Sequence, residues 1–373
     1  MADWESQIEY DLSVNLSTIH LKNPIIADSA GYAVDVPGLR RLIRAGFGGV
    51  VTKSCTWDPM AGSPRKWGLS PIPRLYWDDV QEPTSESEWM DATEALLNPG
   101  YKKMAEFIRE VKPLAKENKT MVIGSIAGRS NEEAVEMARE FEKAGADAIH
   151  MDLTCSSASE YRGQQYPGQG YERLGIYWSE TQDRMIELTK AVKDAVDLPV
   201  FPKALYSTWV RSAPESINSV EEKSKLDCIW TSRSRPPLGL AFIDIYRGRP
   251  VLYPRLIPLK TIVHYTIGDV LAIAKVARKP INSSGGVTST RDVIELIMAG
   301  AQTVGVCSAL YKDVNLIKEI CMGLEQFMAS QAIENLSDIR GVALQYVEDK
   351  PSRLWKEHRE QLKTFPPMKA SSS

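Results

Sequence analysis

Lys53, Cys155 and Lys203 are candidates for chemistry, because their side chains can move a proton or hold a charge and each closes or follows a short apolar segment. Lys53 closes GGVVTK and Lys203 closes LPVFPK, while Cys155 follows DAIHMDL. A cysteine with a lowered pKa can donate or accept a proton during a reaction. A lysine at the end of a buried strand needs an anionic or polar partner, because an unpaired buried ammonium is costly. The simpler alternatives are an inert buried cysteine and lysines held in internal salt bridges.

Two turns rich in glycine and serine have the composition of a phosphate site. The stretches SSGGVT (283–288) and VCSA (306–309) each end an apolar segment and open a predicted helix. Backbone N–H groups and helix dipoles in adjacent turns of this kind often surround one phosphate. The alternative is a pair of tight turns without a ligand, with Cys307 serving packing. The stretch GQGY (168–171) lacks the third glycine and the strand–helix context of a dinucleotide fingerprint, so we expect no NAD site there.

The histidines and cysteines do not form a metal-binding pattern. The cysteines are odd in number with no C-x-x-C pair, and the histidines lack ligand spacing. We therefore expect no metal and no iron–sulfur cluster, assign chemistry to none of the histidines, and favour Cys155 among the cysteines because it follows a strand. Unpaired thiols and an acidic N-terminal segment, unlike a signal peptide, predict a reduced, cytoplasmic protein. The residues are Cys55, Cys155, Cys228, Cys307, Cys321, His20, His150, His264 and His358.

Eight short apolar segments recur along the chain and predict a parallel sheet. Their continuous apolar character, without alternation, is typical of strands covered on both faces, and helix-like stretches separate them. One such stretch begins with a capping residue, Asn131, and ends just before Gly145, and Gly46 and Gly300 hold equivalent places. The predicted fold class is α/β, a (β/α)8 TIM barrel. The segments are residues 24–28, 48–53, 120–126, 147–153, 198–203, 226–230, 279–284 and 303–307.

This prediction assigns residues 1–345 to a single barrel domain and 346–373 to a C-terminal extension whose last residues are disordered. Long loops are expected after the second, fourth and sixth barrel strands, on the face that carries active sites in such barrels. Two of them cover residues 55–97 and 232–260. Their interleaved tryptophan, tyrosine and arginine residues suit a planar or anionic organic substrate, and equally a subunit interface.

The charge balance argues against a polyanionic partner. Lysine and arginine number 45 and aspartate and glutamate 48, which gives a formal net charge of −3. No general attraction to nucleic acid or to an anionic membrane surface is therefore expected. Hydrophobic residues make up 43% of the chain, which is ample for a large core, and we expect no membrane span.

Several segments together resemble a known family. The resemblance is to the class 1 dihydroorotate dehydrogenases and to the pyrimidine-reducing barrel domain of dihydropyrimidine dehydrogenases, and it runs from about Asp11 to Gly341. The VCSAL turn and the following EICMGLEQFM are closer to the second branch. The segments that carry the resemblance are, in order, DLSVNLSTIHLKNPIIADSAG, GGVVTKS, SPIPRLY, GSIAGRS, AGADAIHMDLTCSS, PVFPKA, INSSGGVTSTRDVIELIMAGAQTVGVCSALYKD and LSDIRG.

The resemblance implies a TIM barrel that binds FMN. It implies that Lys203 faces the N1/O2 edge of the flavin, where a cation stabilises the anionic reduced form. Cys155 aligns with the catalytic cysteine, which exchanges a proton with one substrate carbon while flavin N5 exchanges a hydride with the neighbouring carbon. Lys53 is implied as the second catalytic residue, beside the ring. The residues implied to hold the phosphate are Gly285, Gly286, Cys307 and Ser308; those implied elsewhere around the cofactor are Ala27, Asp28, Ser29, Ala30, Lys53, Ser54, Ser125, Asp152, Thr231 and Ser284.

The segment MDLTCSS departs from the family pattern L-N-x-S-C-P-N. Asp152 and Ser157 stand where the family has asparagines that read the amide edges of a pyrimidine ring, and two further asparagines fall at Ala92 and near Thr231. A carboxylate or a methyl group cannot reproduce the donors and acceptors of an amide. We therefore expect a pyrimidine-like substrate that is neither orotate, uracil nor thymine. The candidate substrate-binding residues are Asp152, Ser156, Ser157, Ser232 and Arg233.

Together these features predict an FMN-dependent oxidoreductase that adds or removes hydrogen across an activated C–C bond of a cyclic or carbonyl-conjugated small molecule. Two alternatives stay open: a flavin reductase acting on RNA, similar to the tRNA dihydrouridine synthases, and an electron-transfer subunit without a substrate of its own. The absence of C-x-x-C pairs and of an NAD fingerprint leaves room for a separate electron-donor or acceptor protein. The resemblance also implies a homodimer or a larger homo-oligomer.

Overall fold

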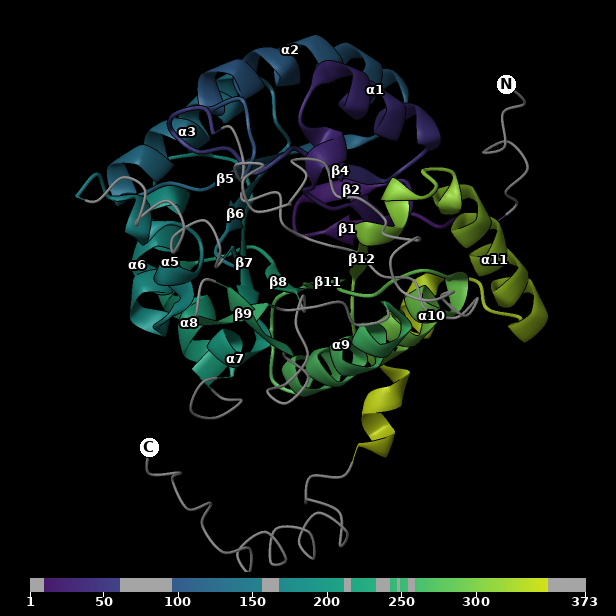
Figure 1. Cartoon of the computed structure of the whole chain (residues 1–373). Helices are drawn as coiled ribbons and strands as arrows, with labels where there is room; N and C mark the ends of the chain where they lie inside the picture. The colour runs from purple at the N-terminus through teal and green to yellow at the C-terminus, as the bar shows by residue number, and fades with distance from the viewer. Residues whose placement is uncertain are drawn as a thin grey trace, which may run out of the picture.

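Eight parallel strands close into a barrel that a ring of helices surrounds (Figure 1). The order around the barrel is β3-β4-β5-β6-β7-β8-β11-β12, and pairing of β12 with β3 completes it. This computed structural model describes residues 10–60, 96–155, 168–210, 216–232, 242–246, 249–253 and 259–347, with the backbone alone for the described part of 242–261. The architecture confirms the predicted (β/α)8 TIM barrel.

Each of the eight apolar segments forms one barrel strand. Nearly all of the strand residues are buried, because one face of each strand lines the barrel core and the other packs against helices. Two strands continue two residues beyond their predicted ends: β7 ends at Leu205 rather than at Lys203, and β8 ends at Ser232 rather than at Trp230. The strands are β3 (Ile25–Ala27), β4 (Gly49–Val51), β5 (Met121–Ile126), β6 (Ala148–Asp152), β7 (Val200–Leu205), β8 (Ile229–Ser232), β11 (Ile281–Ser284) and β12 (Thr303–Val306).

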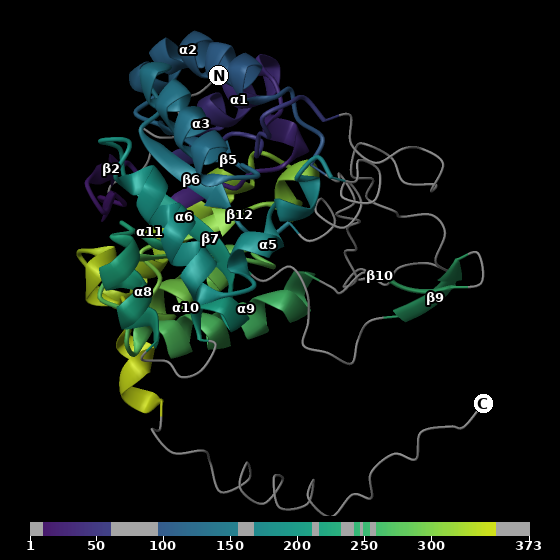
Figure 2. The ribbon, with the colours of Figure 1, turned by 90° about the vertical axis from the view of Figure 1, so that its left-hand side faces the viewer.

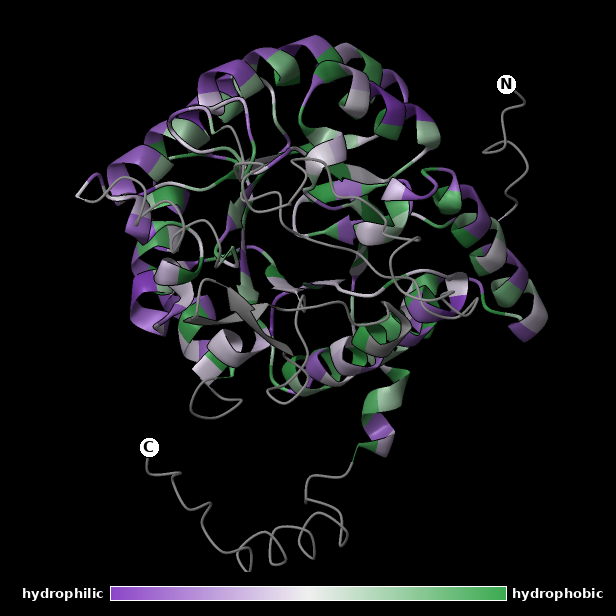
Figure 3. Cartoon of the chain, viewed as in Figure 1, coloured by the Kyte–Doolittle hydropathy of each residue, from purple (hydrophilic) through white to green (hydrophobic). Residues whose placement is uncertain are grey.

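A helix follows every barrel strand and covers its outer face. Apolar residues lie on the side of these helices that faces the barrel and polar residues lie outside, as the hydropathy colouring in Figure 3 shows. Together the strand–helix pairs make up the repeated unit of the barrel. The helices are α1 (Val36–Ala45), α2 (Tyr101–Glu117), α3 (Asn131–Lys143), α6 (Gln182–Lys193), α8 (Ser216–Ser224), α9 (Leu259–Ala274), α10 (Thr290–Ala299) and α11 (Leu316–Gln331).

The ends of the helices follow the predicted signals with one correction. The expectation that Asn131 caps α3 is wrong by one residue: the cap is Ser130, whose Oγ accepts a hydrogen bond from the Glu133 N–H (3.3 Å). Ser130 has extended backbone geometry and so can direct its side chain at the first helical turn, whereas the following residue is already helical. Gly145 and Gly300 have φ angles of 91° and 122°, which confirms their role in reversing the chain after a helix.

Two hairpins were not predicted. β1 (Val14–Leu16) and β2 (Ile19–Leu21) pair antiparallel near the amino-terminal end of the barrel, with Leu21 packed close to Gly49 of β4. β9 (Phe242–Tyr246) and β10 (Arg249–Tyr253) form a second hairpin within the segment predicted as a loop after β8, on the opposite side of the barrel in Figure 2. The shorter helical elements are η2 (Gly31–Ala33), η4 (Tyr171–Arg173), α5 (Ile176–Ser179), α7 (Tyr206–Trp209), η5 (Ser308–Tyr311), η6 (Leu336–Asp338) and η7 (Val342–Tyr346).

Several sequence predictions fall on residues outside the described ranges. Most of the loop over 55–97, the segment 156–167 and residues 348–373 belong there. Trp57 is described and packs against Tyr101, with the ring centroids 4.8 Å apart. The roles of the other tryptophan and arginine side chains of the long loops, and the division into a barrel domain and a C-terminal extension, stay predictions.

Candidate active site

The carboxyl ends of the barrel strands bring Lys53, Cys155 and Lys203 to the same face of the barrel. Lys53 follows β4 and is 7% exposed, Cys155 follows β6 and is half-buried, and Lys203 lies within β7. The parallel register places Lys203 directly beside Asp152 of β6. Catalytic residues of (β/α)8 barrels gather at this face, so the structure brings together the three side chains that the sequence marked for chemistry.

Lys203 forms a buried ion pair with Asp28, the residue after β3. Lys203 Nζ and Asp28 Oδ2 are 3.9 Å apart, and the two side chains are 12% and 2% exposed. Burial lowers the pKa of Lys203, but the carboxylates of Asp28 and Asp152 outweigh it and raise that pKa overall. Burial also raises the pKa of Asp28, with Lys203 opposing it. Lys203 is therefore a fixed positive charge at the barrel mouth, and the internal salt bridge allowed by the sequence is present.

A chain of hydrogen bonds joins polar side chains from neighbouring strands beneath this face. The Ser54 Oγ donates to Asp152 Oδ2 (2.9 Å), and Ser54 Oγ also lies 2.9 Å from Ser125 Oγ and 3.0 Å from Ser29 Oγ. Ser125 Oγ is 2.8 Å from His150 Nδ1. The resemblance pointed to the serines and to Asp152, but His150 was set aside. Its only signal in the sequence is a polar ring inside an otherwise apolar strand.

The carboxylate of Asp152 shapes the turn that carries Cys155. Asp152 Oδ1 accepts hydrogen bonds from the Thr154 N–H (3.1 Å) and the Thr154 hydroxyl (2.8 Å). Burial alone raises the pKa of Asp152, but Lys203, His150 and the hydrogen bonds from Thr154 and Ser54 lower it overall, to about 2. At neutral pH the side chain is an anion that can only accept hydrogen bonds. It therefore holds the residue next to Cys155 in place.

The backbone of Cys155 rests against Gly175. The Ile176 N–H donates to the Cys155 carbonyl oxygen (3.2 Å), and a Cβ on Gly175 would lie 2.2 Å from that oxygen. Gly175 also has a φ angle of 53°, in the left-handed region. Only glycine allows this approach without displacing the cysteine. The sequence analysis did not single out Gly175, because it neither ends a helix nor belongs to a glycine-rich motif.

A small apolar cluster lies beneath the Cys155 side chain. Its buried members are Met60, Leu96, Ala127 and Leu174, and Cys155 packs against them. These residues come from segments that follow β4, precede α2, follow β5 and precede α5, so distant parts of the chain meet under the thiol. The cluster restrains one side of the Cys155 side chain.

Three of the other four cysteines are less suited to proton transfer, whereas Cys307 is half-buried like Cys155. Cys55, Cys228 and Cys321 are fully buried. Burial raises the pKa of Cys55 and of Cys228 far above the ordinary range of a thiol. The inert role named as the simpler alternative therefore applies to these residues, while Cys155 is half-buried at the barrel mouth.

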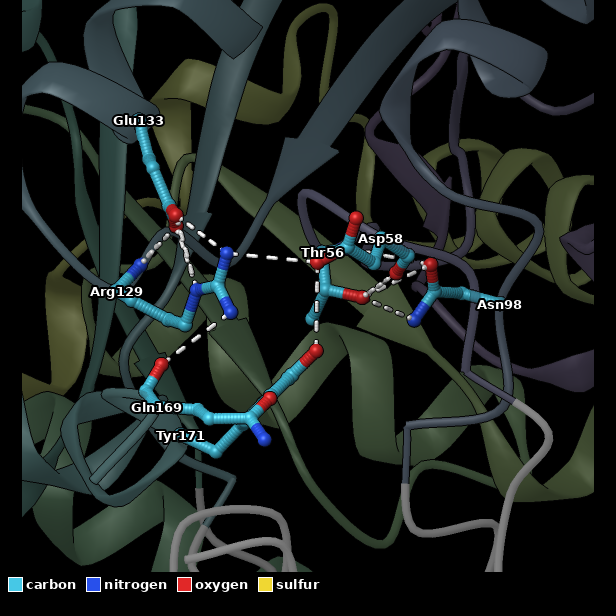
Figure 4. Close-up of polar contacts among 7 residues, drawn as sticks. All are labelled: Thr56, Asp58, Asn98, Arg129, Glu133, Gln169 and Tyr171. Atoms are coloured by element: carbon cyan, nitrogen blue, oxygen red, sulfur yellow. Dashed lines mark hydrogen bonds and ion pairs between the residues drawn. The ribbon is translucent and has the colours of Figure 1, made fainter. Parts of the chain in front are cut away.

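Arg129 joins three segments at the rim of this face (Figure 4). Its Nε and Nη2 donate to the Glu133 carboxylate (2.9 and 2.6 Å), and Nη2 lies 3.4 Å from Asp58 Oδ2. The guanidinium stacks over the Tyr171 ring at 4.6 Å, and the Tyr171 hydroxyl donates to Asp58 Oδ2 (3.3 Å). A further bond from Nη1 reaches the Gln169 carbonyl oxygen (3.4 Å). This cluster ties the segments after β4 and β5 to the segment that contains η4.

Asn98 fastens the two described ends of the long loop between β4 and α2. Its Oδ1 accepts from the backbone N–H groups of Thr56 (3.2 Å) and Gly100 (2.9 Å). Its Nδ2 donates to the Thr56 hydroxyl (3.0 Å), a contact drawn in Figure 4, and to the Leu96 carbonyl oxygen (2.6 Å). Asn98 thus uses both groups of its amide inside the protein and has a structural role beside the site.

The two glycine- and serine-rich turns differ in what they open. Gly285 and Gly286 have φ angles of 137° and 77° and lead into α10, as predicted. The turn at Cys307 opens only η5, because the bond from the Leu310 N–H to the Cys307 carbonyl oxygen (3.0 Å) closes a single 3₁₀ turn. The predicted helix opening is therefore present, but only as this short 3₁₀ helix, since α11 begins later, at Leu316.

Some buried polar atoms near the barrel mouth have no protein partner. They are Asp28 Oδ1, Thr231 Oγ1 and Ser283 Oγ, and the register places Thr231 beside Ser283. Gly305 keeps this corner open, because a Cβ there would lie 2.3 Å from Ser284 Oγ and 3.0 Å from Asp28 Cγ. Buried polar groups nearly always have a partner, so these atoms mark a place where a polar ligand or water binds.

Not every predicted site residue can be placed. Ser232 is buried at the end of β8, whereas Ser156, Ser157, Arg233 and Ala92 lie outside the described residues. Within the described ranges, no group of three or more histidine, cysteine, aspartate or glutamate residues is arranged to hold a metal ion. No helix in that part of the chain is both long and apolar enough to cross a membrane.

Known proteins similar to this chain share one family. The sequence pattern of the family described as dihydroorotate dehydrogenase matches residues 11–328. The catalytic subunit of dihydroorotate dehydrogenase B (NAD(+)) from Pyrococcus abyssi is 28% identical over 342 residues, which cover 89% of this chain and 99% of that protein. The protein of the same name from Methanosarcina mazei is 30% identical over 345 residues, 90% of this chain and 96% of its own. The chain therefore belongs to the dihydroorotate dehydrogenase family and is an oxidoreductase.

Proposed function

We propose that the chain is an FMN-dependent oxidoreductase that adds or removes hydrogen across an activated C–C bond of a cyclic or carbonyl-conjugated small molecule. The observation that carries the proposal is the meeting of a half-buried Cys155 with two buried lysines, Lys53 and Lys203, at the carboxyl face of the barrel. Membership of the dihydroorotate dehydrogenase family supports this type of chemistry.

FMN fits the polar groups at the barrel mouth. Gly285 and Gly286 have positive φ angles and no side chain, which leaves room for a phosphate close to the backbone, in the turn that precedes the cap of α10 at Ser289. The unpaired oxygens of Asp28 and Thr231 are suited to hydroxyl or ring N–H groups of the cofactor. When bound, FMN supplies or accepts a hydride. The full set proposed to hold it is Ala27, Asp28, Ser29, Ala30, Lys53, Ser54, Ser125, Asp152, Lys203, Thr231, Ser284, Gly285, Gly286, Cys307 and Ser308.

Cys155 is the residue that donates or accepts the substrate proton. Its turn is held by Asp152 and its backbone by Gly175, and an apolar cluster restrains one side of its side chain. Lys53 and Lys203 place positive charge at the same face, which favours negative charge that develops on the ring during the reaction. Positioning and electrostatics of this kind are what a proton-transferring residue requires.

The substrate is pyrimidine-like in size, but it is neither orotate nor uracil. Asp152 is an acceptor that already binds Thr154 and Ser54, so it cannot donate a hydrogen bond to a ring carbonyl. We assign the ring contacts to Asp152, Ser156, Ser157, Ser232 and Arg233. Hydroxyl groups can donate or accept and Arg233 adds a positive charge, so this set suits a ring that bears carbonyl or carboxylate groups.

A separate protein exchanges electrons with this chain. The relatives are named as catalytic subunits of NAD(+)-linked enzymes, and the sequence has neither C-x-x-C pairs nor a dinucleotide fingerprint of its own. We therefore propose a separate electron-donor or acceptor protein and a homodimer or larger homo-oligomer. All five cysteines lie among the described residues and none of them forms a disulfide, which supports a cytoplasmic protein.

The test is to purify the full-length protein, record its absorption spectrum and identify the released cofactor. The reduced protein is then mixed without oxygen with unsaturated cyclic acids, amides and ketones, with orotate and uracil included. We expect stoichiometric FMN and reoxidation of the flavin by at least one member of this panel, but not by orotate or uracil. Replacing Cys155→Ala is expected to keep the flavin bound and to slow the substrate step by at least about a hundredfold.

Cys321→Ala is the matched control, because Cys321 is buried in α11 away from the barrel mouth. This variant is expected to reoxidise at the rate of the unaltered protein. A protein without bound flavin would contradict the cofactor proposal, and an unchanged rate in Cys155→Ala would contradict the role of the thiol. Turnover that requires RNA, or a flavin that responds only to a partner protein, would favour the two alternatives to a small-molecule enzyme.

A further inference from the structure

The hydrogen-bonded chain from Asp152 to His150 has only one arrangement of protons if Asp152 is ionised. A carboxylate accepts but does not donate, so the single proton of the Ser54 hydroxyl must point at Asp152 Oδ2. Ser54 Oγ must then accept from its other neighbours, Ser125 and Ser29. Ser29 can do this because its own oxygen accepts from the Ser54 N–H (2.8 Å).

The same reasoning fixes the histidine at the far end. Once Ser125 has directed its proton at Ser54, its oxygen can only accept from His150 Nδ1. Nδ1 must then carry a proton. His150 Nε2 is buried and has no hydrogen-bond partner. The Nε2–H tautomer would leave an N–H group unpaired there and would also reverse the hydrogen bonds of the serines, so it costs more than a bare Nε2. The ring therefore sits as the neutral Nδ1–H form.

The surroundings of His150 favour that neutral ring. His150 is fully buried, with its ring edge-on to Trp230 at 4.8 Å. Burial lowers its pKa and the charge of Lys203 lowers it further, while Asp152 opposes them, and the result is about 3. The parallel register seats His150 beside Ser125 of β5, so strand pairing itself forms this link.

The other oxygen of Asp152 binds the turn that carries Cys155. Oδ1 holds both the N–H and the hydroxyl of Thr154, the residue before Cys155. An amide oxygen could accept the same two hydrogen bonds, whereas a methyl group could accept neither. The two oxygens of Asp152 thus have separable roles. Oδ1 needs only to accept hydrogen bonds from Thr154, whereas Oδ2 needs the charge of the carboxylate to fix the direction of the Ser54 proton.

We infer that Asp152 is a positioning residue: its Oδ1 fixes the turn that presents Cys155, and its charge orients the chain Ser54–Ser125–His150 so that His150 is held as the neutral Nδ1–H tautomer. The importance of the Cys155 turn for turnover rests on the proposed function, while the proton arrangement does not. In this role Asp152 acts through Ser54 and Thr154, in addition to the ring contact assigned to it above, and not on the reacting atoms.

The proton arrangement is tested by NMR on the full-length protein with its cofactor and ¹⁵N-labelled histidine. The two ring nitrogens of a neutral histidine give distinct signals for protonated and bare nitrogen, and a His150→Gln sample assigns the signal among the four histidines. We expect a protonated Nδ1 and a bare Nε2 at neutral pH. A bare Nδ1, or a doubly protonated ring, in the unaltered protein would overturn the inference without any variant.

A pair of variants tests whether the charge of Asp152 sets the direction. In Ser29→Ala, Ser54 still donates to Asp152, so His150 is expected to keep the Nδ1–H form. In the double variant Ser29→Ala with Asp152→Asn, the amide nitrogen donates to Ser54, whose proton must turn towards Ser125 and then towards His150. The tautomer is expected to switch to Nε2–H. The same Nδ1–H signal in the folded double variant would refute control by Asp152.

The turn is tested by the rate at which iodoacetamide modifies Cys155, followed by mass spectrometry of the peptide that contains it. Asp152→Asn keeps an acceptor for Thr154 and is expected to leave this rate within about twofold. Asp152→Ala removes the acceptor and is expected to raise the rate severalfold, because the thiol is no longer held half-buried. Equal rates in the two variants would contradict the positioning role. Expected tautomers in a protein without turnover would uphold the proton arrangement while refuting the proposed function.

Discussion

The carbonyl oxygen of Cys155 occupies the space in which a side chain on Gly175 would begin, 2.2 Å from the position of its Cβ. Gly175 lies 20 positions further along the chain, at the start of α5, and its neighbour Ile176 donates a hydrogen bond to the same oxygen. The placement of the thiol thus depends on a residue that carries no functional group.

Gly175→Ala is expected to displace Cys155 and to lower substrate turnover at least tenfold. The substitution adds the strain of a side chain at φ 53° to a direct overlap with the carbonyl oxygen. Gly168→Ala is the matched control, because Gly168 also has a positive φ (77°) but a Cβ there meets nothing within 4 Å. Both variants are compared by turnover and by thermal unfolding. Equal losses of turnover would show that backbone strain alone, and not the overlap with Cys155, explains the effect.

Arg129→Lys is expected to lower the free energy of unfolding by about 1–2 kcal/mol. Lysine cannot reproduce the two bonds to Glu133 together with stacking on Tyr171, and the Arg129 side chain is only 17% exposed. Arg109→Lys is the control: Arg109 also pairs with a glutamate, Glu140, but is 47% exposed, so a change near zero is expected. Urea unfolding curves measure both. A control as destabilised as Arg129→Lys would mean that the cluster at the rim adds nothing specific.

Lys203 and Asp28 are expected to show a strong coupling in a double-mutant cycle. Lys203→Met leaves the Asp28 carboxylate buried beside an apolar chain, which costs of order 3 kcal/mol when one partner of a buried pair is removed. Adding Asp28→Asn removes that charge, so the double variant should be more stable than the sum of the single losses predicts. Urea unfolding of all four proteins at equal cofactor loading gives the coupling. Additive losses would contradict a buried pair.

The fold was largely predictable because barrel strands that are buried on both faces appear in the sequence as continuous apolar segments. The segment at 120–126 is continuously apolar enough to be assigned, and β5 occupies Met121–Ile126. The register is not marked in the same way. It pairs Ser125 with His150 and Asp152 with Lys203, and a single strand's pattern says nothing about which of its neighbour's residues lies alongside. For this reason Lys203 and Asp152 were found separately, while their contact, and the role of His150, required the structure.

Contacts between residues far apart in the chain were equally impossible to predict from the sequence. Gly175 and Arg129 act through segments distant in the chain, and neither has the spacing of a motif. The β1–β2 hairpin left a weak alternation of buried and exposed residues over Val14–Leu21, which is too short to distinguish from a turn. The family resemblance supplied the cofactor residues, because those lie at strand ends in a fixed order, but it carried no information on the contacts that replace the family's asparagines.

The neutral His150 is expected to make the protein lose stability as the pH falls from about 6.5 towards 3. The unfolded chain binds a proton at this histidine below about 6.5, whereas burial and Lys203 delay protonation in the folded protein until about pH 3. The unfolded state therefore holds more protons in this window, and the free energy of unfolding drops by about 1.4 kcal/mol per pH unit from this group. The lowered pKa of Asp152 acts at lower pH, between its ordinary value near 3.8 and about 2, and stability again falls with falling pH there. This window overlaps only the acid end of the His150 window. His150→Phe keeps an aromatic ring beside Trp230 and removes the titrating group. Its free energy of unfolding in urea should therefore fall by about 2 kcal/mol less than that of the unaltered protein between pH 7 and 5. Its value at pH 7 is expected to be lower, because the contact with Ser125 is lost.

His264→Gln, which removes an exposed ring, is the control and should follow the unaltered protein. The unfolding free energy of His150→Phe could instead change with pH as it does in the unaltered protein. His150 would then bind protons equally in the folded and unfolded states, which would contradict a neutral ring in the folded protein.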